Sequence, residues 1–288
     1  MKKKPITIIV LICLGIFLVF GITSSVLMRS YLVKNGGFDF DFVGAEVIDN
    51  AEVSLDGVDT IKITTLDADV FFTQSDELLT SELYYLGTPR ANQVKLSSYV
   101  EGSTAYIEID YPITSMQLWR SSLTVGLPSD FEGQIIIKSA SGDIHADLPN
   151  TLSSLDVSSV SGDIAMSLIE ASDIALTTQS GLILLDSDVA NTLYANSKSG
   201  DLKLDLSLDS SSQVTLETIS GDVNLSCNAP CITDIKTTSG DIYIDLPDDS
   251  VIQLNYTALD GDYSGGVNTS SDGPLYNISS ISGDLSFE

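Results

Sequence analysis

The feature that most constrains the fold is a tripeptide that recurs at a nearly constant interval. Ser-Gly-Asp, or a degenerate copy of it, occurs eight times between residues 141 and 284, and the central glycines lie 19 to 22 residues apart. These glycines are Gly142, Gly162, Gly181, Gly200, Gly221, Gly240, Gly261 and Gly283. A period of this length indicates a repeat architecture in which each repeat is one small unit of supersecondary structure.

The residues around each glycine form columns when the repeats are aligned. The second and fourth residues after the glycine are apolar in most copies, and the residue between them is mostly polar or small. The seventh and fifth residues before the glycine are also mostly apolar, and the third is always Ser, Thr or Ala. Alternation with a period of two is typical of a strand with one buried face. Each repeat therefore predicts a strand, a Ser-Gly corner, a second strand and a looser turn.

A single repeat of this kind cannot bury its apolar face alone, but stacked repeats can. We therefore expect an all-β fold, a parallel β-helix or solenoid with rungs of roughly 20 residues. Rungs lie about 4.8 Å apart, so eight of them would extend over roughly 40 Å. An antiparallel meander with the corners as hairpins is the alternative, but the matching of whole columns favours the solenoid. We assign residues 45–135 to irregular rungs and residues 136–288 to regular rungs of the same domain.

The N-terminal residues have the pattern of a membrane anchor. A basic tail, residues 1–4, precedes an uncharged and largely apolar run over residues 5–28, which is long enough to cross the hydrocarbon core of a bilayer. Lysines before such a transmembrane helix stay in the cytoplasm. We therefore expect a single-pass protein of the cell membrane, with residues 29–44 as a stalk and the repeat domain extracytoplasmic. A cleaved signal peptide is the alternative, because residues 23–25 are small enough for cleavage.

Beyond the first 30 residues the chain is strongly acidic. Nine basic residues there face all 40 acidic residues, which gives this part a net charge of −31. Such a surface repels nucleic acid, so we expect no nucleic-acid partner. It suits cations, a basic partner or solubility alone.

The repeats in combination with a preceding segment resemble a known family. A Leu-Thr-Val-Gly-Leu-Pro segment at residues 123–128, followed by tandem Ser-Gly-Asp-Ile strands, resembles the bacterial putative-adhesin family of β-strand-repeat domains in its membrane-anchored Gram-positive type. The likeness covers residues 45–288. It implies a right-handed parallel β-helix, and some relatives with one N-terminal anchor sit beside cell-envelope stress systems. The family offers no established catalytic residues to carry over.

These observations predict a binding or adhesin-like module at the cell envelope. Its partners would be the membrane, through the N-terminal helix, and an unknown surface ligand or membrane protein. One alternative is an accessory protein of a cell-envelope stress system that acts through membrane partners. Another is a carbohydrate-active β-helix enzyme, because acids that such enzymes use are abundant. We expect no enzymatic activity, since the only histidine, His145, lies in an outward column where we expect a solvated side chain.

The aspartates of the corners form a column of their own. Neighbouring carboxylates about 5 Å apart repel unless they are hydrated, hydrogen-bonded or bridged by cations. We favour a structural role, in which each Asp accepts backbone N–H bonds in its turn, over a calcium ladder. A separate, weak calcium candidate comprises Asp260, Asp262 and Ser264, which match the early spacing of a calcium-binding loop, although position twelve is Ser271 instead of Glu. We expect no cofactor, with calcium as the alternative.

Two further groups of residues are candidates for local roles. Cys227 and Cys231 are the only cysteines after the apolar run, and their spacing can close a small disulfide in an oxidising compartment, with two free thiols as the alternative. We expect them to pair. Trp119, Met116 and Tyr111 lie in or beside an apolar segment without clear alternation. This segment either caps the open end of the solenoid, which we favour, or forms an exposed contact patch.

Overall fold

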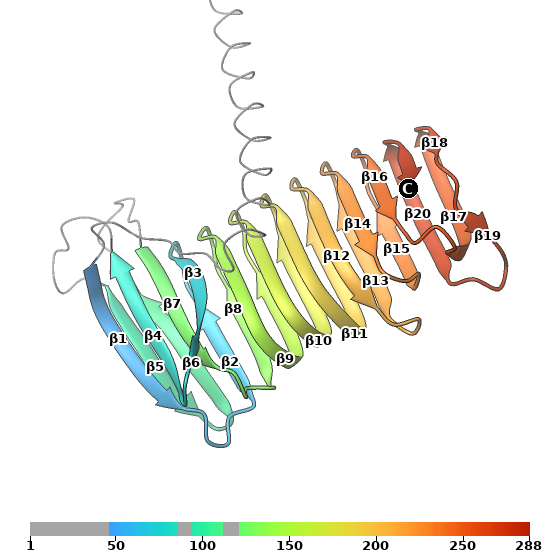
Figure 1. The fold of residues 1–288 in the computed structure, drawn as a ribbon. Coiled ribbons are helices and arrows are strands. Elements are labelled where there is room, and N and C mark those ends of the chain that lie inside the picture. The colour runs from blue at the N-terminus through green and yellow to red at the C-terminus, as the bar shows by residue number, and fades with distance from the viewer. Residues whose placement is uncertain (1–45, 86–93, 112–120) are drawn as a thin grey trace, which may run out of the picture. The chain divides into compact units, whose positions relative to one another are not determined.

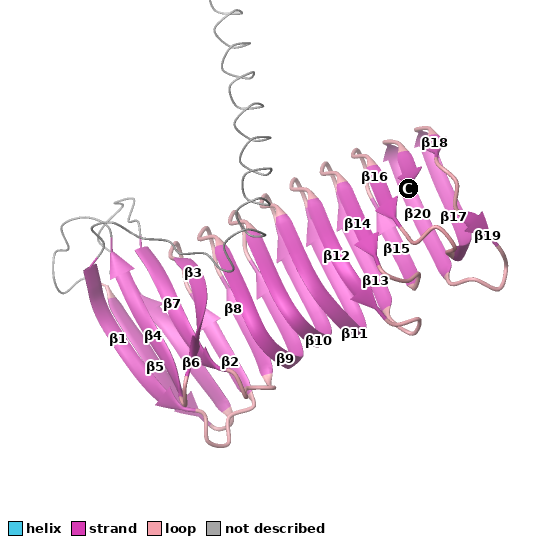
Figure 2. Cartoon of the chain, viewed as in Figure 1, coloured by secondary structure: helices cyan, strands magenta, loops and turns pink. Residues whose placement is uncertain are grey.

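The structure, a computed structural model, describes residues 46–85, 94–111 and 121–288. This part consists of strands, turns and loops, as Figure 2 shows. It forms a parallel β-solenoid of about eight turns, which confirms the predicted fold and excludes the meander for the regular repeats. In the described residues no helix is long and apolar enough to cross a membrane. The predicted tail, transmembrane helix and stalk, residues 1–44, lie outside the described residues.

The regular rungs stack in parallel on both sides of the Ser-Gly corners (Figure 1). The long strands β9 (Ile144–Ser158), β10 (Ile164–Thr178) and β11 (Ile183–Ser197) each leave one corner, bend and enter the next. Beyond them the rungs divide into separate strands: β12 (Leu202–Leu208), β13 (Gln213–Thr218), β14 (Val223–Cys227), β15 (Ile232–Lys236) and β16 (Ile242–Asp245). The strands that enter corners form one sheet, here called the pre-corner sheet, and those that leave corners form the post-corner sheet.

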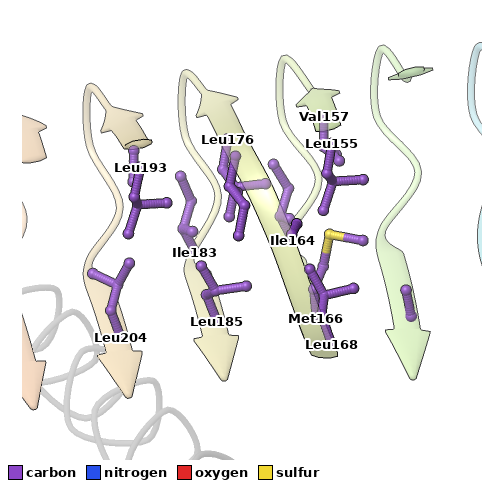
Figure 3. Packing of buried hydrophobic residues seen from close by; sticks show 14 of the residues in the cluster. Leu155, Val157, Ile164, Met166, Leu168, Leu176, Ile183, Leu185, Leu193 and Leu204 are labelled. Atoms are coloured by element: carbon purple, nitrogen blue, oxygen red, sulfur yellow. The ribbon is translucent and has the colours of Figure 1, made fainter. Parts of the chain in front are cut away.

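The core lies between these two sheets and is built from the columns that the alignment predicts. Equivalent residues are paired in register, so Ile164 lies beside Ile144 on one side and Ile183 on the other. The side chains of Ile164 and Ile183, and that of Leu176 in the facing column, point into the space between the sheets (Figure 3). Full burial of one such side chain contributes about 1.5–3 kcal/mol. Identical positions thus pack on one another from rung to rung, which makes the period of the repeat strict.

At the N-terminal end the rungs do not follow the order of the sequence. The first rung, β2 (Thr60–Thr64) with β3 (Asp69–Ser75), lies between two later ones. These are β6 (Thr104–Asp110) with β7 (Ser121–Pro128), and β8 (Gln134–Lys138) with β9. The chain therefore runs outward from its first rung and returns to stack against the other side of it.

Three antiparallel strands complete this end: β1 (Glu46–Ser54), β4 (Leu78–Tyr85) and β5 (Lys95–Glu101). In this part of the chain the parallel strands form rungs, and these three antiparallel strands do not. The hairpin between β5 and β6 turns at Gly102, whose φ of 65° is accessible to glycine at little cost. Short turns of this kind reverse the chain within one sheet instead of continuing it around the rung.

The C-terminal end is also interleaved. β20 (Leu275–Ser282) lies between β15 and β17 (Val251–Asp260), and β21 (Leu285–Phe287) lies between β16 and β18 (Tyr263–Ser264). The last repeat of the sequence is thus the last but one in space. The side chains of this repeat fill the interior, since Tyr276 and Phe287 are buried. In the outer rung the position equivalent to Phe287 is Gly265, which has no side chain. A rung with a half-empty interior is tolerated only at the end of a stack, where nothing must pack on it.

Candidate functional site

The corner glycines are required by close approach between rungs. A Cβ atom built on Gly200 would lie 1.8 Å from the carbonyl oxygen of Gly181, and one on Gly221 would lie 2.1 Å from that of Gly200. Neither glycine has a positive φ. Each corner therefore rests on the backbone of the previous corner, and any side chain would push the rungs apart.

At three consecutive corners, those of Gly181, Gly200 and Gly221, the small residue three positions before the glycine closes the corner with two hydrogen bonds. The backbone N–H of Gly200 donates to Ser197 Oγ (2.8 Å), and the Ser197 hydroxyl donates to the carbonyl of Gly181 in the previous rung (3.1 Å). Thr178 and Thr218 make the same pair of contacts. At these three corners the hydroxyl thus fixes the local turn and joins two rungs.

The aspartate column links rungs as well. Oδ1 of Asp143 accepts the backbone N–H of Asp163 (2.8 Å), and Asp201 and Asp222 accept the N–H of the next corner residue in the same way (3.0 and 2.9 Å). The aspartates therefore do accept backbone N–H bonds, but from the following rung and not from their own turn as predicted. Leu182 interrupts the column, so at this position there is no carboxylate to accept a hydrogen bond from the backbone N–H of Asp201.

The weak calcium candidate lies on the outermost rung. Asp260, Asp262 and Ser264 are all exposed, and the N–H of Asp262 donates to Asp284 Oδ1 (2.8 Å) as an ordinary member of the column. Over residues 46–85, 94–111 and 121–288, no three His, Cys, Asp or Glu side chains are grouped closely enough to hold a metal ion.

The two cysteines lie at the end of β14 and just before β15 as free, buried thiols. Burial raises the pKa of both thiols, and the nearby Cys231 adds to the effect on Cys227. Burial likewise raises the pKa of the Tyr276 hydroxyl, which lies beside both cysteines and Thr233. The two sulfurs thus share one buried pocket of the core, and their pairing stays a prediction.

The proposed contact patch is only partly within the described residues. Trp119 and Met116 lie outside them. Tyr111 is half-buried against the core, its hydroxyl lies 3.3 Å from Thr65 Oγ1, and burial raises its pKa. His145 is not freely solvated as expected, because its ring stacks on Phe71 with 5.2 Å between centroids, and burial lowers the pKa of its imidazole.

Sequence reasoning missed an ordered set of polar side chains on the outer face of the pre-corner sheet, here called the polar array: Tyr194, Asn196, Glu217, Asp234, Lys236, Asn255 and Asn277. Tyr194 (3.1 Å) and Asn196 (3.3 Å) donate to Glu217 Oε2, and Lys236 joins Glu217 to Asp234. The chain of contacts continues from Asp234 through Asn277 (3.2 Å) to Asn255 (2.9 Å).

The polar array therefore spans five neighbouring strands, β11, β13, β15, β20 and β17. Apart from Asp234 and Lys236 on β15, its bonded partners are 19 to 43 residues apart in the sequence. The signal that could have revealed it is the pair of outward columns six and four residues before the corner glycines, where these residue types recur.

An acidic depression of about 570 Å³ lies near the N-terminal end of the solenoid. Its wall contains one aromatic ring and five carboxylates: Phe131, Asp56, Asp59, Glu77, Asp130 and Glu132. These residues come from the turns after β1, β3 and β7, which the interleaving of the first rungs brings together.

Comparisons with known proteins agree with this architecture. The profile of a family described as Toastrack DUF4097 matches residues 58–284. A crystal structure described as a putative lipid binding protein from Parabacteroides distasonis is 13% identical, with 86% of this chain and 98% of that chain covered and a TM-score of 0.52. This likeness shows the fold alone.

Two structures described as putative adhesins are also similar. The protein from Bacteroides fragilis is 13% identical, with 83% and 96% of the two chains covered and a TM-score of 0.43. The one from P. distasonis is 14% identical, with 82% and 95% covered and a TM-score of 0.41. A comparison with curated proteins gave no match.

Proposed function

Because the chain belongs to the Toastrack DUF4097 family, we propose that it is a membrane-anchored binding module that displays its solenoid on the outside of the cell membrane, as in the Gram-positive type that the repeats resemble. The uncharged run over residues 5–28, after three lysines, supports the anchor. Protease added to intact cells should then remove the solenoid and leave the N-terminus in the membrane fraction. A soluble protein that begins near residue 26 would contradict the anchor.

The polar array is the observation that carries the binding role. Its amides, carboxylates, ammonium group and phenol present both donors and acceptors on a flat face. Their mutual hydrogen bonds hold the side chains in place, so little conformational entropy is lost when a ligand binds. Tyr194 is 38% exposed and offers a ring beside these groups. A hydroxyl-rich ligand such as an envelope polysaccharide fits this combination of a ring and paired donors and acceptors.

A pair of matched variants tests this role. Tyr194→Ala removes the ring from the polar array, and Tyr243→Ala removes the same side chain from the outer face of the post-corner sheet. Binding of the full chain to purified cell-wall polysaccharide should weaken about tenfold for Tyr194→Ala, equivalent to about 1.4 kcal/mol, and hardly change for Tyr243→Ala. Equal losses in both variants, or no binding by the unaltered chain, would contradict the proposal.

An accessory role in a cell-envelope stress system predicts a different dependence. Such a protein acts through membrane partners, so replacing residues 5–28 by an unrelated transmembrane helix should abolish its effect on the stress response. A display module should tolerate the exchange. We favour the display module because the ordered polar surface lies on the solenoid.

We propose that the protein is not an enzyme, and the acidic depression is the place to test this. A glycoside hydrolase needs two carboxyl groups on either side of the scissile bond. Asp130→Asn and Glu132→Gln remove charges from the wall of the depression. Release of reducing sugar from cell-wall polysaccharide by the unaltered chain, lost in either variant, would overturn the proposal.

A further inference from the structure

The two ends of the solenoid expose edge strands of different character. At the N-terminal end β1 carries Glu46, Asp49 and Glu52, and its pairing with β4 is interrupted by a bulge between Val47 and Asp49. Asp49 Oδ2 also accepts the N–H of Leu96 on β5 (3.0 Å). Charges, bulges and side chains that bond to exposed backbone are the usual means by which proteins prevent edge strands from pairing with other chains. The N-terminal edge is thus protected.

The C-terminal edge, β17, lacks these devices. Residues 250–259 hold no charged residue and no proline, in a chain with 40 acids. β17 pairs regularly with β20 on one side. On its other side, among residues 46–85, 94–111 and 121–288, only Val251 and Ile252 are paired, with Asn268 and Thr269 of β19. Residues 253–259 therefore present an open edge.

The backbone groups on this open edge follow from the ladder. The N–H of Gln253 donates toward β20, to the carbonyl of Pro274 (2.9 Å). Because successive residues of a strand point their backbone groups to opposite sides, Leu254, Tyr256 and Ala258 direct their N–H and C=O groups outward.

The side chains of these residues mark the place where the core ends. Leu254 and Tyr256 are only half-buried, whereas Tyr276 and Ile278, beside them on β20, are almost fully buried. Next to them, Leu259 is 84% exposed and Tyr263 is 45% exposed. The end of the solenoid thus combines an unpaired strand edge with apolar surface that one further rung would cover.

We propose that a second copy of this chain covers this end, by antiparallel pairing of β17 with its own equivalent about a twofold axis at Tyr256. The open edge runs from residue 253 to residue 259, and its central residue is Tyr256, so a symmetric pair uses all of it. β19 limits the pairing at one side and the corner at Asp260 limits it at the other. In this register Leu254 faces Ala258 of the partner, and the two apolar interiors become continuous.

Charge favours this occupant and this geometry. Two copies of an acidic protein repel each other over most of their surface, but the open edge is uncharged. In the proposed register the two Asp260 residues are eight strand positions apart, or about 27 Å, well beyond the distance of about 10 Å over which charges act in salt solution. Residues 253–259 are therefore a stretch along which two copies can pair without an acidic side chain on the paired strands.

Site-directed cross-linking tests the register. In the proposed pair Asn255 faces Thr257 of the partner at a non-hydrogen-bonded position, where Cα atoms are about 4.5 Å apart and a disulfide can form. The double variant Asn255→Cys/Thr257→Cys of the full chain, purified in mild detergent, should give a disulfide-linked dimer on oxidation. The control Gln213→Cys/Thr215→Cys places the same pair on β13, inside the stack, and should not. Equal cross-linking of both variants, or none in the first, would overturn the proposal.

A charge variant and hydrogen exchange distinguish the second copy from other occupants. Thr257→Glu places like charges close together across the proposed axis, whereas Gln213→Glu adds the same charge to β13. Sedimentation over a dilution series should show a dimer for the unaltered chain and for Gln213→Glu, and a monomer for Thr257→Glu. Amides of residues 254, 256 and 258 should lose protection on dilution. Protection that does not depend on concentration would mean that another part of the same chain covers the edge, and the proposal would be wrong.

Discussion

Replacement of Gly200 by alanine should destabilise the solenoid although alanine is the better residue for most backbone conformations. The new Cβ would lie 1.8 Å from the carbonyl oxygen of Gly181 and 2.9 Å from Ser197 Oγ. The first contact is with backbone, so the rungs themselves must move. Forced overpacking of this kind costs about 1–3 kcal/mol. Loss of the hydrogen bond between Ser197 and Gly181 adds about 1 kcal/mol. We therefore expect a loss of about 2–4 kcal/mol in the free energy of unfolding.

Gly266→Ala is the matched control. Gly266 has no positive φ and no atom within 4 Å of the position that a Cβ would take, so this substitution should change stability by less than about 0.5 kcal/mol. Because repeat proteins need not unfold in one step, urea unfolding should be combined with hydrogen exchange. Gly200→Ala should lower amide protection most in β11, β12 and β13. Similar unfolding curves for the two variants would show that the corners do not need glycine for the close approach of neighbouring backbones, and would refute this explanation.

Three other changes follow from the same contacts. Leu182→Asn should supply the missing acceptor for the N–H of Asp201 and raise stability by about 0.5–1.5 kcal/mol in urea unfolding. The control Leu184→Asn, at the start of β11, should not raise it; no difference between the two variants would contradict the role of the column. Deletion of residues 275–288 should remove the strands with which β17 and β18 pair, and their amides should lose protection in hydrogen exchange. If the rungs were stacked in sequence order, the amides of β17 and β18 would stay protected. If Cys227 and Cys231 pair in the exported protein, mass spectrometry without reduction should show a loss of two hydrogens; modification of both residues by a thiol reagent after unfolding would exclude the pair.

The regular part of the fold could be predicted because its signal is repeated. Residues such as Ile144, Ile164 and Ile183 occupy one column in the alignment and are neighbours in the structure. The corner could be predicted for the same reason. The contact of Gly200 with Gly181 shows that close approach between rungs, and not a positive φ, requires glycine at the corner.

The interleaving of the ends could not be predicted from the tripeptide, because the copies at Gly261 and Gly283 both fit the period. The distinguishing residues are farther from the corner: Phe287 can fill the interior of a rung and Gly265 cannot. The outward columns of the polar array are visible in the sequence, but its bonds could not be predicted, since Glu217 accepts bonds from Tyr194 and Lys236 on the two neighbouring rungs. Outward-facing positions accept many residue types, so the residue types alone do not show which side chains form hydrogen bonds or ion pairs with one another.

The repeated aspartates hold neighbouring rungs together directly, through their carboxylate oxygens. The most direct test compares thermal unfolding of the unaltered chain and of Asp222→Asn, each with and without a calcium chelator. Asparagine keeps an oxygen that can accept the N–H of Asp241. The account predicts that Asp222→Asn changes the melting temperature only slightly and that the chelator changes neither curve. A large fall in the melting temperature both on chelation and in Asp222→Asn would contradict it and identify the corner as a metal-binding ladder.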